Sequence, residues 1–67
     1  MGIVKVIELL AESKESWEDA ACNAVAKAGE SVKNIHSANV SNLSVTVKDG
    51  KVDKYRVNVK LSFSVKD

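Results

Sequence analysis

The sequence predicts an α+β fold in which one strand, one helix and two further strands follow one another within a single domain, residues 1–67. Three observations predict it. Residues 55–65 alternate apolar and polar at every position, the period of two that is typical of a strand with one buried and one polar face. Apolar residues recur every three or four positions from Trp17 to Val32, as in an amphipathic helix. The Asp-Gly pair at 49–50 separates two alternating runs and favours a tight hairpin.

Residues 3–11 form the expected first strand. Lys5 and Glu8 interrupt its apolar run, which is therefore too short and too charged for a signal-peptide core or a membrane span. Val6 stands where an N-terminal myristoylation signal requires Ser or Thr. The lone Cys22 allows no disulfide within the chain and fits a reducing compartment. We therefore expect a soluble, cytoplasmic protein.

The helix is expected to begin after Ser13, whose hydroxyl can cap a free amide of the first turn. Glu15, Glu18 and Asp19 suit the positive end of the helix dipole. At about 20 residues the helix would reach roughly 30 Å. Its apolar stripe is mostly alanine, which allows close approach to a sheet, and comprises Trp17, Ala20, Ala21, Ala24, Val25, Ala28 and Val32.

The second strand is expected over residues 35–47 and changes phase on the way. Val40 is apolar at an even position, whereas Leu43 is apolar at an odd one. One extra residue near positions 41–42 would produce this shift, so the pattern predicts a β-bulge there.

The closing strand follows the hairpin turn. Val52 and Tyr55 differ in parity, which predicts a second bulge at residues 53–54. The alternating run 55–65 would span about 37 Å, longer than a compact domain of this length is wide. A chain of 67 residues also buries only about 60% of its unfolded surface. We therefore expect the strand to curve and the chain to associate with copies of itself.

The polar face of the two long strands is the expected functional surface. Residues 1–47 carry four lysines and six carboxylates (net −2), whereas residues 48–67 carry six lysines or arginines and three aspartates (net +3). Lys54, Arg56 and Lys60 alternate along one face. This pattern has two interpretations, a solvated face with cross-strand pairing or a pocket for phosphate or another anion. The face comprises Asn39, Ser41, Ser44, Thr46, Arg56, Asn58, Lys60, Ser62 and Ser64.

Other chemistry-bearing residues favour structural roles. Trp17 lies on the helix stripe, and Tyr55 and Phe63 share the apolar strand face, so core or interface positions are expected for all three. His36 has no second histidine nearby and would ligate a metal only by clustering around a symmetry axis. Cys22 has no base beside it in sequence, and an inert thiol is expected.

Catalysis and nucleic-acid binding have little support. The sequence has no nucleophile elbow, no paired carboxylates at a recognisable site and no phosphate-binding glycine loop, so we expect no enzyme. The basic strand carries no exposed aromatic residue for base stacking. Asp49 and Asp53 could contribute to a cation site between subunits, although calcium-loop spacing is absent.

In this order and with these residues, the chain resembles the dodecin family of small flavin-binding proteins. The resemblance implies a three-stranded antiparallel sheet partly wrapped around one long helix, twelve subunits in a hollow shell, and flavin bound in pairs at the inner, polar side of the sheets. It rests on the strand Val4 to Leu9, on Ser13, Ser16, Trp17, Ala20, Ala21 and Ala24 of the helix, on Ile35 to Val40, on Asp49-Gly50-Lys51-Val52, and on Tyr55, Arg56, Val57, Lys60 and Phe63.

Two residues depart from the family's flavin-binding pattern. Ser37 stands where the family's tryptophan stacks on the flavin ring, and Arg56 stands where its glutamine bonds the ring edge. Arginine only donates hydrogen bonds, although it can stack on a π system or hold a phosphate.

The expected function is a non-enzymatic, homododecameric ligand-binding and storage protein. Flavin, as riboflavin or FMN, is the first candidate ligand, and Ser37, Asn39, Ser44 and Arg56 are the candidate binding residues. The alternative is a flavin-free shell that is structural or holds a metal cation or another anion.

Overall fold

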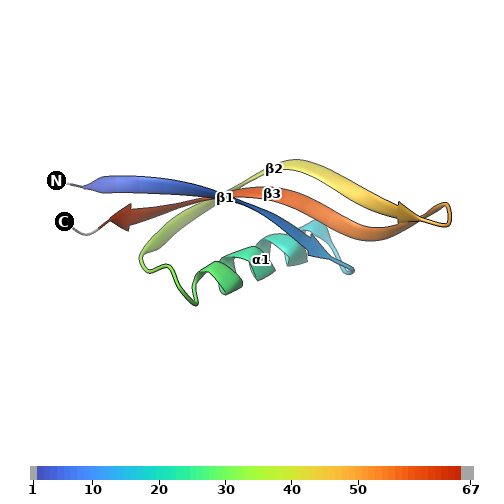
Figure 1. Ribbon diagram of the computed structural model, residues 1–67, viewed down its shortest axis with the longest axis horizontal. Coiled ribbons are helices and arrows are strands. Elements are labelled where there is room, and N and C mark those ends of the chain that lie inside the picture. The colour runs from blue at the N-terminus through green and yellow to red at the C-terminus, as the bar shows by residue number, and fades with distance from the viewer. Residues whose placement is uncertain (1, 66–67) are drawn as a thin grey trace.

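The computed structural model describes residues 2–65 and confirms the βαββ order. The elements are β1 (Ile3–Ser13), α1 (Trp17–Ala28), β2 (Ile35–Lys48) and β3 (Lys51–Val65). The strands form an antiparallel sheet in the order β1-β3-β2, so that β3 is central and β1 and β2 are the edges. Figure 1 shows α1 lying along one face of this sheet, below its middle.

The core lies between the alanine face of α1 and the centre of β3. The register places Leu9 opposite Val59 and Ala11 opposite Val57, so apolar side chains of β1 and β3 lie side by side on the helix side. Small alanine side chains allow the helix backbone to approach the sheet closely. Among the described residues, the buried hydrophobic side chains are Ala20, Ala24, Ala28, Val57, Val59 and Leu61.

The two predicted bulges are present. Asn42, at a φ of 50°, is the extra residue between the Ser41 and Leu43 pairs. Asp53 is the extra residue between Val52 and Lys54. The first bulge returns Leu43 to the helix side of β2, where a regular strand would have turned it away. A third irregularity, at His36, was not anticipated.

The hairpin turn also has the predicted geometry. Asp49 and Gly50 have φ values of 53° and 73°, and both central residues of a type I′ turn require positive φ. The turn lies at the opposite end of the molecule from the start of β1 and the end of β3 (Figure 1).

The predicted start of the helix was wrong. Ser16 is the N-cap, because its hydroxyl accepts a hydrogen bond of 2.9 Å from the backbone N–H of Asp19. Ser13 instead ends β1. Its hydroxyl accepts from the backbone N–H of Glu15 at 2.9 Å and donates to Asp19 Oδ2 at 2.6 Å. Ser13 thus stabilises the connection between strand and helix, not the first turn.

The predicted helix length was also wrong, because α1 has 12 residues. At about 1.5 Å per residue it is roughly 18 Å long. Gly29, a poor helix former, follows Ala28. Beyond it the backbone tightens, with Glu30 N bonded to Lys27 O at 3.2 Å and Ser31 N bonded to Ala28 O at 3.1 Å.

The protomer is elongated. Its extents are 51 × 20 × 13 Å and its radius of gyration is 13.7 Å, against about 11 Å for a compact domain of this length. The β2–β3 hairpin projects well beyond α1 (Figure 1). Within residues 2–65, no helix is long and apolar enough to cross a membrane.

We expect Ser16→Ala to lower the free energy of unfolding by about 1 kcal/mol, because one N–H at the helix start loses its acceptor. Urea unfolding at one fixed protein concentration, followed by circular dichroism, measures it. Ser31→Ala, the same change in the loop after α1, is the matched control. Equal effects of the two substitutions would contradict Ser16 as the cap.

Candidate functional site

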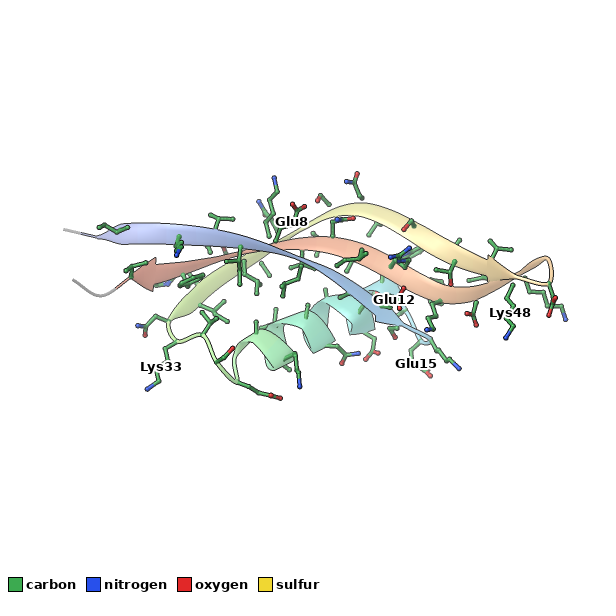
Figure 2. All side chains as sticks on the ribbon, in the orientation of Figure 1. Glu8, Glu12, Glu15, Lys33 and Lys48 are labelled. Carbon is green, nitrogen blue, oxygen red and sulfur yellow. The ribbon has the colours of Figure 1, made fainter. Side chains whose placement is uncertain are left out.

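The candidate site is the face of the sheet opposite α1, which we call the open face. Alternation along each strand and the pairing register define its members. β2 contributes Ser37, Asn39, Ser41, Ser44 and Thr46, β3 contributes Lys54, Arg56, Asn58, Lys60, Ser62 and Ser64, and β1 contributes Val4, Val6, Glu8, Leu10 and Glu12. Figure 2 shows Glu8 projecting from β1 on the side away from α1.

The structure places all four candidate ligand-binding residues on the open face, with Ser37 at one level and Ser44 and Arg56 at another. Ser37 pairs opposite Ser62, and Ser44 pairs opposite Arg56. Six positions of β3 separate these two levels, which at roughly 3.4 Å per residue is about 20 Å. Asn39 lies between them, opposite Lys60. Within one protomer, Ser37 and Arg56 therefore do not line a common small-molecule pocket.

The Ser37 end of the open face is a set of hydroxyl contacts. Ser37 Oγ lies 2.5 Å from Ser62 Oγ. His36 Nε2 is hydrogen-bonded to Ser64 Oγ. These side chains are hydrogen-bonded to one another across the β2–β3 pair. They offer polar atoms to a ligand but no Phe, Tyr or Trp ring for stacking.

The aromatic side chains lie elsewhere, as predicted. Tyr55 and Phe63 lie on the helix side of β3, at either end of the buried run Val57, Val59 and Leu61. The Trp17 ring meets Tyr55 edge to face with centroids 5.0 Å apart. Trp17 Nε1 donates a 2.9 Å hydrogen bond to the carbonyl oxygen of Ser44, which ties the start of α1 to the edge strand β2.

The cations of β3 are paired with β1 carboxylates. Arg56 Nε lies 3.0 Å from Glu12 Oε2, although this buried N–H is not aligned for a hydrogen bond. Lys54 Nζ lies 3.7 Å from Glu12 Oε1. Lys60 stands opposite Glu8 in the register. Of the two interpretations of these alternating cations, the structure favours cross-strand pairing over a free anion pocket.

Sequence reasoning missed Glu12 and the β1 half of the open face. The signal was the even spacing of Glu8 and Glu12, which puts both carboxylates on one face of the first strand. Even spacing also brings Val4, Val6 and Leu10 to this face, where they are 59%, 56% and 53% exposed. The open face is therefore polar along β2, basic along β3, and apolar with two carboxylates along β1.

Candidate metal ligands do not gather within the described part of the chain. Residues 2–65 contain no group of three or more His, Cys, Asp or Glu side chains placed to hold an ion. Asp49 and Asp53 lie at the far end of the hairpin, and Cys22 is exposed on α1.

Several known proteins are similar to this chain in sequence and fold. The family model for dodecin matches residues 3–66. The chain is 35% identical over 66 residues to calcium dodecin of Mycobacterium tuberculosis. This alignment covers 98% of this chain and 93% of the relative. The crystal structure of calcium dodecin from that organism matches with a TM-score of 0.85 and 37% identity, over 96% of this chain and 91% of that one. Dodecin from Streptomyces coelicolor shares the fold with a TM-score of 0.94 at 24% identity, over 98% and 94% of the two chains.

We expect Glu12→Gln and Arg56→Gln to be coupled by about 0.2–1 kcal/mol in a double-mutant cycle of unfolding free energies, because both side chains are partly exposed. The coupling should shrink in 1 M salt, where the Debye length falls to about 3 Å.

The matched control pairs Glu12→Gln with Lys60→Gln. Lys60 faces Glu8 and not Glu12, so this cycle should show no coupling. Equal coupling in the two cycles would contradict a specific Arg56–Glu12 contact.

Proposed function

Because the chain belongs to the dodecin family, we propose that its residues 1–67 form one protomer domain of a homododecameric, non-enzymatic shell that binds and stores a small ligand between copies. The elongated protomer supports assembly, because its radius of gyration of 13.7 Å exceeds that of a compact domain. Valines and leucines left more than one-third exposed on both faces of the sheet support it as well.

The ligand we propose is a divalent cation such as Ca²⁺. The observation that carries this choice is the make-up of the open face, where the described residues are hydroxyls, amides, charged groups and aliphatic side chains with the His36 imidazole at one end, and no Phe, Tyr or Trp. Such a face offers oxygen ligands but no Phe, Tyr or Trp ring to sandwich a flavin. Calcium dodecin of Mycobacterium tuberculosis, which is 35% identical to this chain in the sequence comparison and 37% identical in the structure comparison, supports the same class of ligand.

Asp49 and Asp53 are the carboxylates we propose for this site. They lie at the tip of a hairpin that projects from the body of the protomer (Figure 1), where a neighbouring copy can reach them. Ca²⁺ takes six to eight oxygen ligands, so two carboxylates of one copy would be completed by oxygens of another.

Flavin is the second candidate ligand, and Arg56 is the residue that favours it. A guanidinium can stack on the flavin ring or hold the phosphate of FMN. In this case Ser37, Asn39, Ser44 and Arg56 would line the site. Two copies would have to contribute, because the Ser37 and Arg56 levels are about 20 Å apart on one protomer.

Native mass spectrometry of the purified protein tests the assembly. We expect a complex of twelve 7.2 kDa chains, together with any ligand that it retains. A monomer at micromolar concentration would contradict the proposed shell.

For the ligand, we expect saturating Ca²⁺ to raise the thermal midpoint relative to EDTA-treated protein, because a ligand at 100 times its Kd stabilises the folded state by about 2.7 kcal/mol. Asp49→Asn with Asp53→Asn should abolish this shift. The first substitution keeps a turn that accepts Asn-Gly as readily as Asp-Gly. Glu30→Gln, at the end of the helix region beside Lys27, is the control and should leave the shift intact.

The same protein titrated with FMN distinguishes the two candidates. Under the cation proposal, flavin fluorescence stays unquenched at micromolar FMN. Quenching that Arg56→Ala removes, together with no response to Ca²⁺, would contradict the cation and support flavin.

A further inference from the structure

Two apolar surfaces remain exposed on the protomer, on opposite faces and opposite edges of the sheet. The first, the β1 strip, lies on the open face and consists of Val4, Val6 and Leu10. The second, the β2 groove, lies on the helix side between α1 and β2. Its apolar lining includes Ala21, Val25, Ala38, Val40 and Leu43.

The β2 groove exists because α1 lies over β1 and β3 more than over β2. It contains two hollows of about 380 and 310 Å³, which share Ala21 and Val40 and are therefore continuous. Val40 and Leu43 remain 47% and 57% exposed at its floor. Leaving these side chains in water costs about 25 cal/mol for each Å² of apolar surface.

The β1 strip has the opposite shape. β1 pairs with β3 without a register shift along its whole length, so alternation places Val4, Val6 and Leu10 on the face opposite α1. The carboxylates beside the strip, Glu8 and Glu12, face Lys60 and Arg56 of the same copy. A partner that covers the strip therefore contacts apolar side chains, and the carboxylates beside them already face cations of the same copy.

We infer that in the assembly the β1 strip of one copy lies in the β2 groove of the next copy. This inference rests on the proposed assembly and names the surfaces that build it. If the β2 grooves of two copies faced each other, the contact would enclose empty volume, and apolar cavities are destabilising. A strip of projecting valines and a leucine fills the groove instead. Because the two surfaces differ, the contact is heterologous and repeats head to tail until it closes a ring.

Two substitutions test the contact, Val6→Asp in the strip and Val40→Asp in the groove. Both side chains are about half exposed in the protomer, so the protomer fold should survive, as circular dichroism would show. Each variant alone should fall to a smaller species of the same size by native mass spectrometry, since each removes one half of the same contact.

Mixing the two variants supplies the decisive outcome. The intact groove of Val6→Asp can receive the intact strip of Val40→Asp, so a 1:1 mixture should form a complex larger than either variant alone. Ser31→Asp, which adds the same charge in the loop after α1, should keep the wild-type size. A mixture that stays at the size of the single variants, or single variants of different sizes, would overturn the inference.

Cross-linking provides a second readout, because Cys22 lines the groove. Under a thiol oxidant such as diamide, cysteine placed in turn at Val4, Val6 and Leu10 should give covalent oligomers with Cys22 of the next copy at one position or more. The same variants carrying Cys22→Ala should give none. Dimers that persist without Cys22 would show strip against strip and overturn the inference.

These results separate the inference from the proposed function. If the wild-type protein is a monomer, both fail. If it assembles but Val6→Asp and Val40→Asp also assemble at full size, the shell stands and the strip-in-groove contact is wrong.

Discussion

The short contact between the alanine face of α1 and the centre of β3 is the constraint on which the rest of this structure depends. The helix has 12 residues and is roughly 18 Å long, whereas the sheet runs almost the full 51 Å of the molecule. Val57, Val59 and Leu61 are fully buried because they lie beneath the helix. Outside this footprint, apolar residues of the same sheet stay largely exposed, among them Val40, Leu43 and Val47, which is why we propose contact with other copies.

The open face follows from the same geometry. Every side chain that alternation turns away from α1 is left without a covering layer, so its character is set strand by strand. β2 presents hydroxyls and an amide, β3 presents three cations, and β1 presents two carboxylates, of which Glu12 pairs with Arg56 and Lys54. The pairing of Glu12 with Arg56 and Lys54 favours cross-strand pairing, one of the two interpretations that the sequence left open, over an anion pocket. At the other end of the face, the hydroxyls of Ser37 and Ser62 lie 2.5 Å apart across the β2–β3 pair.

Several features of the fold could be predicted because they depend on neighbours in sequence. The alternation of residues 55–65 identified the buried face of β3, and the change of phase near Asn42 located a bulge. The Asp-Gly pair predicted a turn with positive φ at both residues. The helix start was wrong because Ser13 and Ser16 are equally good caps by composition. The strand pairing of Ser13 with Tyr55 in β3 decided between them.

The sequence by itself determined the order of the elements, the helix-facing sides of β2 and β3 and two of the three irregularities of the β2–β3 pair, because periodicity and turn chemistry are local properties of the chain. Only the tertiary structure decided that β3 is central, that Glu12 compensates Arg56, that Ser37 and Arg56 lie at separate levels, and that a groove opens between α1 and β2. These depend on which strands pair and where a short helix comes to rest, and residues far apart in sequence settle both.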